Sequence, residues 1–172
     1  MGGRTGARGR ARLKSVRVGQ GFDVHRLVAG RSLFLGGVEV PHGRGLEGHS
    51  DGDCVLHAIC DALLGAVGAG DMGQHFPSRD PQWRGVASRV FLEHTARLVR
   101  ERGFRVENVD VTVVAQEPVL ASHLEPMRVA ISGILDVDRD AVSVKAKSTD
   151  HLGALGRGEG IAALAAVLVI AE

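Results

Sequence analysis

Apolar residues recur at helical spacing between residues 54 and 67, and polar residues crowd the start of this segment. The apolar stripe consists of Val55, Leu56, Ile59, Cys60, Leu63, Leu64 and Val67. Ser50 or Asp51 can cap the start of such a helix, because a short side-chain oxygen satisfies amides that the helix leaves free. Asp53, His57 and Asp61 are four residues apart and share one face. Either a capped helix with a solvated acidic edge or a site of polar chemistry explains this pattern.

Alternating polarity and short apolar runs predict four strands, at residues 16–25, 105–114, 142–146 and 161–170. A hairpin is expected over 32–40, turning at Gly36 and Gly37. Helices are expected over 86–102 and 126–135. Residues 41–48 and 70–81 are predicted as loops because they are rich in Gly and Pro. We therefore predict an α+β (two-layer α/β) fold, in which a mixed four-stranded sheet packs on helices beside a small hairpin.

The composition is typical of a globular protein with its own core. Of the 172 residues, 44% are hydrophobic and only 3% are aromatic, so the core must be built from Val, Leu, Ile and Ala. No apolar run approaches the ~20 residues that a membrane span needs. The length predicts one domain.

The net charge of +1 conceals a basic N-terminus. Residues 1–17 contain six Lys or Arg and no acid, which leaves 15 basic and 20 acidic residues in the remainder. This acidic balance argues against a nucleic-acid-binding body. We expect residues 1–15 to be a basic, disordered and dispensable extension before a single domain over 16–172. A nucleic-acid-binding arm and a fragment of a transit peptide are the alternatives.

Cys54 and Cys60 are the only cysteines of the chain. Six residues apart on one helix, they point in different directions and cannot form a disulfide. This predicts a reducing compartment such as the cytoplasm.

Asp23, His25 and His57 are the most informative candidates for a metal site. Alternate residues of a strand share a face, so Asp23 and His25 project together while Val24 points to the other face. The helix supplies His57 as a third group. Two His and one carboxylate are a known ligand set of catalytic zinc, which keeps a fourth position open. The alternative is that both His side chains only accept hydrogen bonds in the core.

A second candidate is the tetrapeptide Lys-Ser-Thr-Asp at 147–150. Hydroxyls, a cation and a carboxylate at a strand end suit a phosphate and a hard cation such as magnesium. An ordinary helix cap is the alternative. The Gly-rich segment 156–160 precedes a strand rather than a helix, so it is not a phosphate-binding loop.

Six motifs together resemble those of the 2-C-methyl-D-erythritol 2,4-cyclodiphosphate synthase family. They are Gly-Phe-Asp-Val-His at 21–25, His-Ser-Asp-Gly-Asp at 49–53, Asp-Ala-Leu-Leu-Gly at 61–65, Gly-Asp-Met-Gly at 70–73, Asn-Val-Asp-Val-Thr at 108–112 and Gly-Arg-Gly-Glu-Gly at 156–160. They stand in the family's order with matching separations, and the resemblance covers residues 16–171. It implies a ferredoxin-like variant of the two-layer fold and a homotrimer with active sites between neighbouring subunits.

The resemblance also implies a reaction of the non-mevalonate isoprenoid pathway. Enzymes of this family convert 4-diphosphocytidyl-2-C-methyl-D-erythritol 2-phosphate to 2-C-methyl-D-erythritol 2,4-cyclodiphosphate and release CMP, which makes them phosphorus–oxygen lyases. The substrate's 2-phosphate attacks its own β-phosphorus, so the protein acts by positioning and electrostatics rather than through a nucleophile. A cytoplasmic location is expected, with a plastid as the alternative.

The resemblance assigns site residues by their positions in the motifs. The metal ligands are Asp23, His25 and His57 for one zinc ion per subunit, and Asp150 for magnesium or manganese bound with the substrate. The residues that steady charge at the reacting phosphates are His49 and Ser148. The substrate-binding residues are Ser50, Asp71, Met72, Gly73, Phe76, Asp80, Ala115, Pro118, Leu120, Ala121, Lys147, Thr149, Ala154 and Arg157. The residues of a cavity on the trimer axis, which can hold an isoprenoid diphosphate, are Phe22, Val24, Arg157 and Glu159.

Several positions depart from the family pattern. Asp150 keeps a carboxylate but is one methylene shorter than the usual Glu, and Lys147 adds a cation beside the phosphates. Ala154 replaces a large apolar residue, Ser78 stands where Asp is common, and Val119 replaces a frequent Lys. None of these changes removes a zinc ligand, so they bear on the second metal and the nucleotide contacts.

Two other functions stay open at this point. A zinc phosphohydrolase would admit water to the open zinc position. A non-catalytic trimer that binds isoprenoid diphosphates is suggested by the altered segment 147–150.

Overall fold

The structure is a computed structural model that describes residues 15–172, so the expected basic extension, except for Ser15, lies outside the described part. The strands are β1 (Val16–Ala29), β2 (Leu33–Leu35), β3 (Val38–Val40), β4 (Arg44–Leu46), β5 (Phe104–Val114), β6 (Val142–Lys147) and β7 (Gly160–Ala171). The helices are α1 (Cys54–Ala66), α2 (Met72–His75), α3 (Ser88–Glu101), α4 (Leu124–Leu135) and α5 (Gly153–Gly156). Three 3-10 turns are η1 (Pro81–Trp83), η2 (Ala121–His123) and η3 (Arg139–Ala141).

The main sheet has five strands in the order β4-β1-β7-β5-β6, and β2 pairs with β3 in a separate hairpin. Strand β7 runs antiparallel to both β1 and β5, whereas β5 and β6 are parallel, so the sheet is mixed as predicted. The predicted number of four strands is wrong by one. Residues 44–46, expected in a loop, pair with residues 27–29 at the end of β1.

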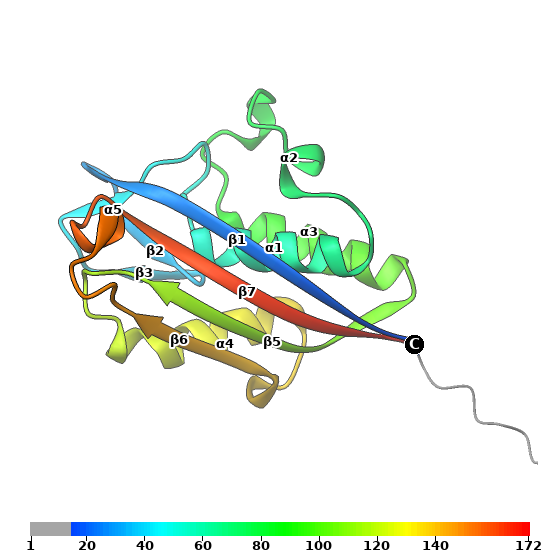
Figure 1. The fold of residues 1–172 in the computed structure, drawn as a ribbon. Helices are drawn as coiled ribbons and strands as arrows, with labels where there is room; N and C mark the ends of the chain where they lie inside the picture. The colour runs from blue at the N-terminus through cyan, green and yellow to red at the C-terminus, as the bar shows by residue number, and fades with distance from the viewer. Residues whose placement is uncertain (1–14) are drawn as a thin grey trace, which may run out of the picture.

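Helices α1, α3 and α4 lie on one side of the main sheet and cover it, which gives the two layers (Figure 1). The core between the layers consists mainly of Val, Leu, Ile and Ala, because the chain has few aromatic residues to contribute. The opposite face of the sheet is open. Val18 is 70% exposed and Phe22 is 56% exposed on that face, so a row of apolar side chains along β1 lacks a covering layer within residues 15–172.

The hairpin turns as predicted, and a second connection has more order than the sequence indicates. The hairpin turns at Gly36 and Gly37, whose φ angles of 60° and 78° are both positive, as a two-residue turn requires. Residues 70–81, predicted as an irregular loop, contain the single turn α2 and the start of η1. Asp71 caps α2 and Asp80 caps η1, since each carboxylate accepts a hydrogen bond from an amide of its own turn.

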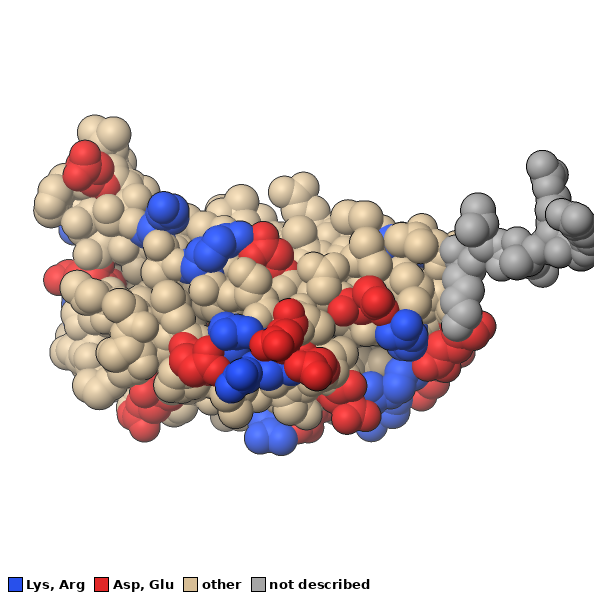
Figure 2. All heavy atoms as spheres, turned by 90° about the horizontal axis from the view of Figure 1, so that it is seen from below, with Lys and Arg blue, Asp and Glu red and all other residues tan. Residues whose placement is uncertain are grey.

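Charged side chains of both signs alternate on the side where α4 and β6 lie, as Figure 2 shows from below. Arg128 of α4, for example, pairs with Glu125 and Asp140. This face therefore differs from the continuous basic surface of nucleic-acid-binding proteins. None of the helices within residues 15–172 has the length and hydrophobicity to cross a membrane.

Candidate metal centre and active site

Three potential metal ligands meet between β1 and α1. Asp23 and His25 project from the helix-covered face of β1, and His57 points toward them from the first turn of α1. Asp23 Oδ2 lies 2.9 Å from His25 Nε2 and 2.9 Å from His57 Nδ1, and these two ring nitrogens are 3.3 Å apart. The structure therefore brings together the three residues that the sequence singles out, and we call them the triad.

The triad fits a metal ion by donor type and by spacing. Zinc bonds of about 2.0–2.1 Å in tetrahedral geometry separate neighbouring ligand atoms by roughly 3.3 Å. The observed separations of 2.9 to 3.3 Å need only a small outward adjustment to admit an ion. All three side chains are partly buried, so a fourth coordination position can face a ligand from solvent.

The negative charge of Asp23 and a positive charge on the neighbouring imidazoles stabilise each other. Burial raises the pKa of the Asp23 carboxyl, but hydrogen bonds and charge interactions with His25 and His57 outweigh burial and hold this pKa well below its ordinary value. Burial lowers the pKa of His25, but its hydrogen bond and charge interaction with Asp23 outweigh burial and raise this pKa. A proton on the His25 imidazole thus neutralises the Asp23 carboxylate. A cation bound in a metal site has the same effect on its carboxylate ligand.

Two glycines of β1 let α1 approach closely enough for His57 to reach the strand. A Cβ at Gly19 would lie 1.8 Å from the carbonyl oxygen of Ala62, and a Cβ at Gly21 would lie 2.0 Å from that of Ala58. Real Cβ atoms do not approach backbone this closely, so only glycine fits at both positions. The same face of one strand therefore carries two ligands and sets the distance to the third.

Asp53, rather than Ser50 or Asp51, caps α1. Its carboxylate accepts hydrogen bonds from two amides in the first turn, both at 3.1 Å. It also accepts hydrogen bonds from the amides of Gly36 at 2.9 Å and Gly37 at 2.7 Å in the hairpin turn. Asp53 is fully buried, and burial raises the pKa of its carboxyl. Because Asp53 belongs to the core, the interpretation of a solvated acidic edge is wrong at this position.

A cavity of about 700 Å³ opens beside His25. Its walls include the predicted His49 and Ser50, together with Arg31 and Arg84, which sequence reasoning missed. Arg31 donates hydrogen bonds to the carbonyl oxygens of Gly48 at 2.9 Å and Ser50 at 2.6 Å. The two Arg lie in loops without a recognisable motif, so only the structure reveals this positive charge beside the triad.

A smaller cavity of about 140 Å³ shares His25, His49 and Ser50 with the larger one and continues past His57. The predicted Met72 and Phe76 line it, and so do Ser78, Trp83 and Phe91. The Phe76 and Phe91 rings are 4.7 Å apart between centroids. This apolar wall beside polar ligands suits a substrate with a short hydrocarbon part.

A separate pocket of about 280 Å³ gathers most of the predicted nucleotide contacts. Its walls include Ala115, Pro118, Leu120, Ala121, Lys147 and Ser148, with the departing residue Val119 among them. Thr149 follows the pocket and donates a hydrogen bond from its hydroxyl to the Leu152 carbonyl at 2.8 Å. Asp150 is exposed and adopts a left-handed backbone conformation with φ of 53°.

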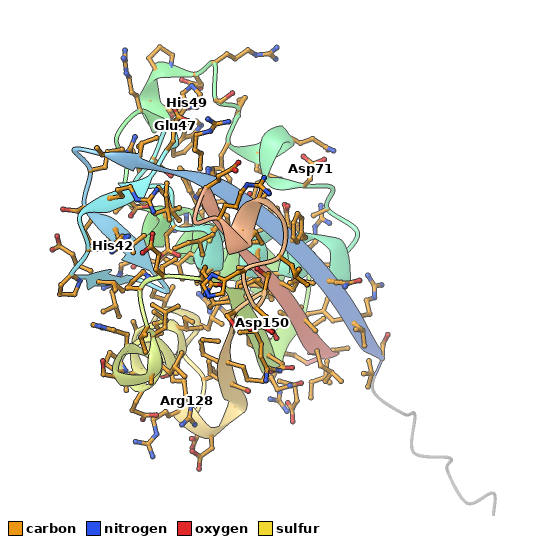
Figure 3. The ribbon with its side chains drawn as sticks, turned by 60° about the vertical axis from the view of Figure 1, so that its left-hand side comes forward. His42, Glu47, His49, Asp71, Arg128 and Asp150 are labelled. Carbon is orange, nitrogen blue, oxygen red and sulfur yellow. The ribbon has the colours of Figure 1, made fainter. Side chains whose placement is uncertain are left out.

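The triad on β1 and this pocket beside β6 are separated by most of the width of the sheet in one chain. A row of paired residues crosses the sheet from Val24 through Ala162 and Val114 to Lys147. Three steps between neighbouring strands amount to about 14 Å. In Figure 3, His49 and Asp71 lie toward the top, whereas Asp150 lies well below them.

The remaining predicted residues are at the surface. Gly73 and Ala154 are exposed. Phe22 and Val24 lie on the open face of the sheet. Arg157 donates a hydrogen bond from Nε to Glu159 at 2.6 Å, so these two residues pair with each other.

The match to known proteins covers nearly the same residues as the described fold. The profile of the YgbB family matches residues 16–170. The chain belongs to the YgbB family. This match leaves out the basic start.

Named relatives of this YgbB-family chain are of two kinds. It is 54% identical over 156 residues to a 2-C-methyl-D-erythritol 2,4-cyclodiphosphate synthase of Azotobacter vinelandii, covering 91% of this chain and 99% of that protein. It is 55% identical over 160 residues to a bifunctional enzyme IspD/IspF of Erythrobacter litoralis, covering 93% of this chain and 42% of that protein. The chain thus spans about two fifths of the bifunctional relatives that it matches.

Solved structures share the fold of this YgbB-family chain. A CDP complex of IspF from Plasmodium falciparum superposes with a TM-score of 0.81 at 33% sequence identity, covering 91% of this chain and 97% of that one. The predicted resemblance to the cyclodiphosphate synthase family is therefore confirmed by sequence and by structure.

Proposed function

We propose that residues 16–172 form one synthase domain that converts 4-diphosphocytidyl-2-C-methyl-D-erythritol 2-phosphate to 2-C-methyl-D-erythritol 2,4-cyclodiphosphate and releases CMP. The observation that carries this proposal is the Asp23–His25–His57 triad beside an Arg-lined cavity. It stands in a chain that is 54% identical to a protein of this name over nearly that protein's whole length.

The triad would hold zinc, one ion per subunit, because its two imidazoles and one carboxylate match a known catalytic zinc set. When bound, such an ion polarises a phosphate oxygen and stabilises charge that develops during phosphoryl transfer. The chain's own groups do the rest by positioning. Arg31, Arg84 and His49 offer donors to phosphate oxygens in the larger cavity. The wall containing Phe76 and Phe91 holds the methylerythritol part and excludes water from the bent substrate.

The nucleotide would bind in the pocket formed by residues 115–121 and by Lys147 and Ser148. A CDP-bound family structure supports a cytidyl ligand. Lys147 would balance phosphate charge, and the Ser148 hydroxyl would donate a hydrogen bond to a phosphate oxygen. Asp71 and Gly73 at the start of α2 would contact the ribose, as the family motif implies.

The triad of one protomer and the nucleotide pocket of its neighbour would form one active site in a homotrimer of ferredoxin-like protomers. The triad and the nucleotide pocket are about 14 Å apart across one sheet, so one chain does not close both around the substrate. The open sheet face carries exposed apolar side chains, among them Val18, Phe22, Val24 and Leu164, and an apolar patch of this kind is typical of a subunit interface. In the trimer, Phe22, Val24, Arg157 and Glu159 would line the axial cavity for an isoprenoid diphosphate.

The proposed location is a reducing compartment, the cytoplasm or a plastid. Both Cys54 and Cys60 are free thiols and fully buried. Burial raises the pKa of both thiols, so they are kept as packing groups rather than as redox groups.

A product assay tests the proposed reaction. With zinc and magnesium present, we expect the protein to convert the cytidyl substrate to the cyclic diphosphate and CMP in equal amounts, read by phosphorus NMR. Linear phosphate products would instead identify a zinc phosphohydrolase. No turnover together with tight binding of an isoprenoid diphosphate would identify the non-catalytic trimer.

Asp150→Glu tests the second metal site. Asp150 would bind magnesium or manganese at the substrate's α- and β-phosphates, and its short side chain reaches less far than the usual Glu. We expect the variant to lower the magnesium concentration needed for half-maximal turnover several-fold, with zinc content unchanged. Asp150→Ala, the matched control, should raise that concentration. Equal magnesium dependence in all three proteins would remove Asp150 from the second site.

A further inference from the structure

The His57 ring has a second contact that the triad does not use. Its Nδ1 faces Asp23, whereas its Nε2 lies 2.8 Å from the hydroxyl oxygen of Ser88. Ser50 Oγ is also near, at 3.3 Å from His57 Nε2, but it accepts a hydrogen bond from the Gly52 amide at 3.1 Å. Ser88 is fully buried at the first position of α3, so its hydroxyl cannot exchange these partners for water.

The Ser88 hydroxyl has one proton and two further neighbours, the Asp51 carboxylate and Ser50 Oγ, which lies 3.2 Å away and can donate its own proton. Ser88 Oγ donates a short hydrogen bond to the Asp51 carboxylate, which can only accept. The Ser88 oxygen then has only lone pairs to offer His57 Nε2. Ser88 therefore favours a proton on His57 Nε2, in competition with the Asp23 carboxylate, which lies 2.9 Å from Nδ1 and accepts from a proton there when no cation is present. With a cation on the triad, a proton on Nε2 leaves the Nδ1 lone pair free for that cation.

Asp51 is itself held in place by backbone amides. It accepts hydrogen bonds from the amide of Ser88 at 3.0 Å and the amide of Asp53 at 3.1 Å. Helix α3 has no side-chain cap of its own, so Asp51 satisfies its first amide from a distant segment. One carboxylate thus joins the start of α3 to the loop that precedes α1, the helix carrying His57.

We propose that Asp51 and Ser88 are positioning residues that fix the tautomer and orientation of His57 through a chain of hydrogen bonds, so that Nδ1 is the metal-binding nitrogen. The inference rests on the proposed metal site of the triad, but the balance of His57 tautomers can be measured without a metal. Outer partners of this kind usually fix the ligand nitrogen of metal-bound histidines, and their loss commonly costs 10–100-fold in metal affinity.

Ser88→Ala is the first test, with two readouts on the purified full chain. Two-bond proton–nitrogen NMR of the metal-free protein should show a larger share of His57 protonated on Nε2 in the wild type than in the variant, where only Asp23 still accepts strongly, at Nδ1. His57→Gln assigns the signal. Competition with a chromophoric chelator should show zinc affinity reduced about tenfold, because Ser50 can replace Ser88 only in part. Asp51 keeps both amide donors in this variant, so no buried carboxylate is left without a partner.

Ser132→Ala is the matched control. Ser132 is also a buried helical serine, but it lies in α4 and its hydroxyl donates to the Val129 carbonyl at 3.1 Å. We expect wild-type tautomer and zinc affinity there. An equal loss of affinity in both serine variants would overturn the proposal, because it would show a general effect of packing. An unchanged His57 tautomer in Ser88→Ala would overturn it as well.

Asp51→Asn supplies a second, independent variant if Ser88→Ala fails to fold. Its amide group can donate to Ser88 Oγ, which turns the serine proton toward His57 Nε2 and favours the tautomer protonated on Nδ1. We expect that tautomer to increase and zinc affinity to fall. A wild-type tautomer in Asp51→Asn would overturn the proposal. If the wild type itself binds no zinc, the proposed metal is wrong, while the NMR experiment still decides the tautomer.

Discussion

His57→Ala is expected to abolish zinc binding and turnover while the trimer survives. The variant leaves Asp23 and His25 as the only members of the triad, and two ligands are too few for a catalytic zinc site. Metal ions contribute several kcal/mol to stabilising charge in the transition state, so we expect turnover to fall at least about 10³-fold. Zinc content by mass spectrometry, the product assay and light scattering measure the three outcomes.

The matched control for this prediction is His123→Ala in η2, which removes a partly exposed imidazole from outside the triad and the described cavities. It should keep zinc, turnover and assembly. Full activity of His57→Ala without detectable zinc would refute the metal assignment. Loss of the trimer in His57→Ala would show that the ring is needed for the fold rather than for the metal alone.

Gly21→Ala is expected to destabilise the protein by about 3 kcal/mol or more. The new Cβ would lie 2.0 Å from the Ala58 carbonyl oxygen and 2.7 Å from the Ala62 amide nitrogen. These are backbone atoms of α1, so the helix itself must move, and overpacking of this kind commonly costs 1–3 kcal/mol and occasionally more. Since α1 carries His57, we also expect weaker zinc binding in whatever fraction folds. Urea unfolding and zinc titration measure the two effects.

Gly65→Ala provides the comparison on the same helix. Gly65 is exposed, and no atom lies within 4 Å of the position its Cβ would take. Replacing a helical glycine by alanine in open space should stabilise the protein by about 0.5–1 kcal/mol. Equal stability of the two variants would show that the close contact between β1 and α1 is not rigid.

Much of the triad could be anticipated from local periodicity. The two-residue repeat of β1 places Asp23 and His25 on one face, and the helical repeat places His57 above the apolar stripe of α1. The resemblance to a known family then assigned them to zinc. Neither argument gives the distances from His57 Nδ1 to Asp23 Oδ2, 2.9 Å, and to His25 Nε2, 3.3 Å. These distances depend on how closely α1 packs on β1.

Other parts of the site could not be predicted because their partners are distant in the sequence. The cap of α1 was assigned to Ser50 or Asp51, but Asp53 has two further donors in the hairpin turn that make it the better acceptor. Strand β4 was predicted as loop, because three residues around a glycine show no alternation and their order comes from pairing with β1. Ser88 stands 31 residues from His57 in the chain and had no motif to mark it.

The sequence by itself determined the longer elements, which residues share a face of β1, and the family, because periodicity and motif spacing act within short segments. The tertiary structure decided which side chains meet. Asp51 reaches the start of α3, Asp53 reaches the hairpin, and two arginines line the cavity beside the triad. The physical reason is that hydrogen bonds and metal geometry act over about 3 Å. Only the packing of a helix on a glycine-bearing strand brings groups from three segments within that range.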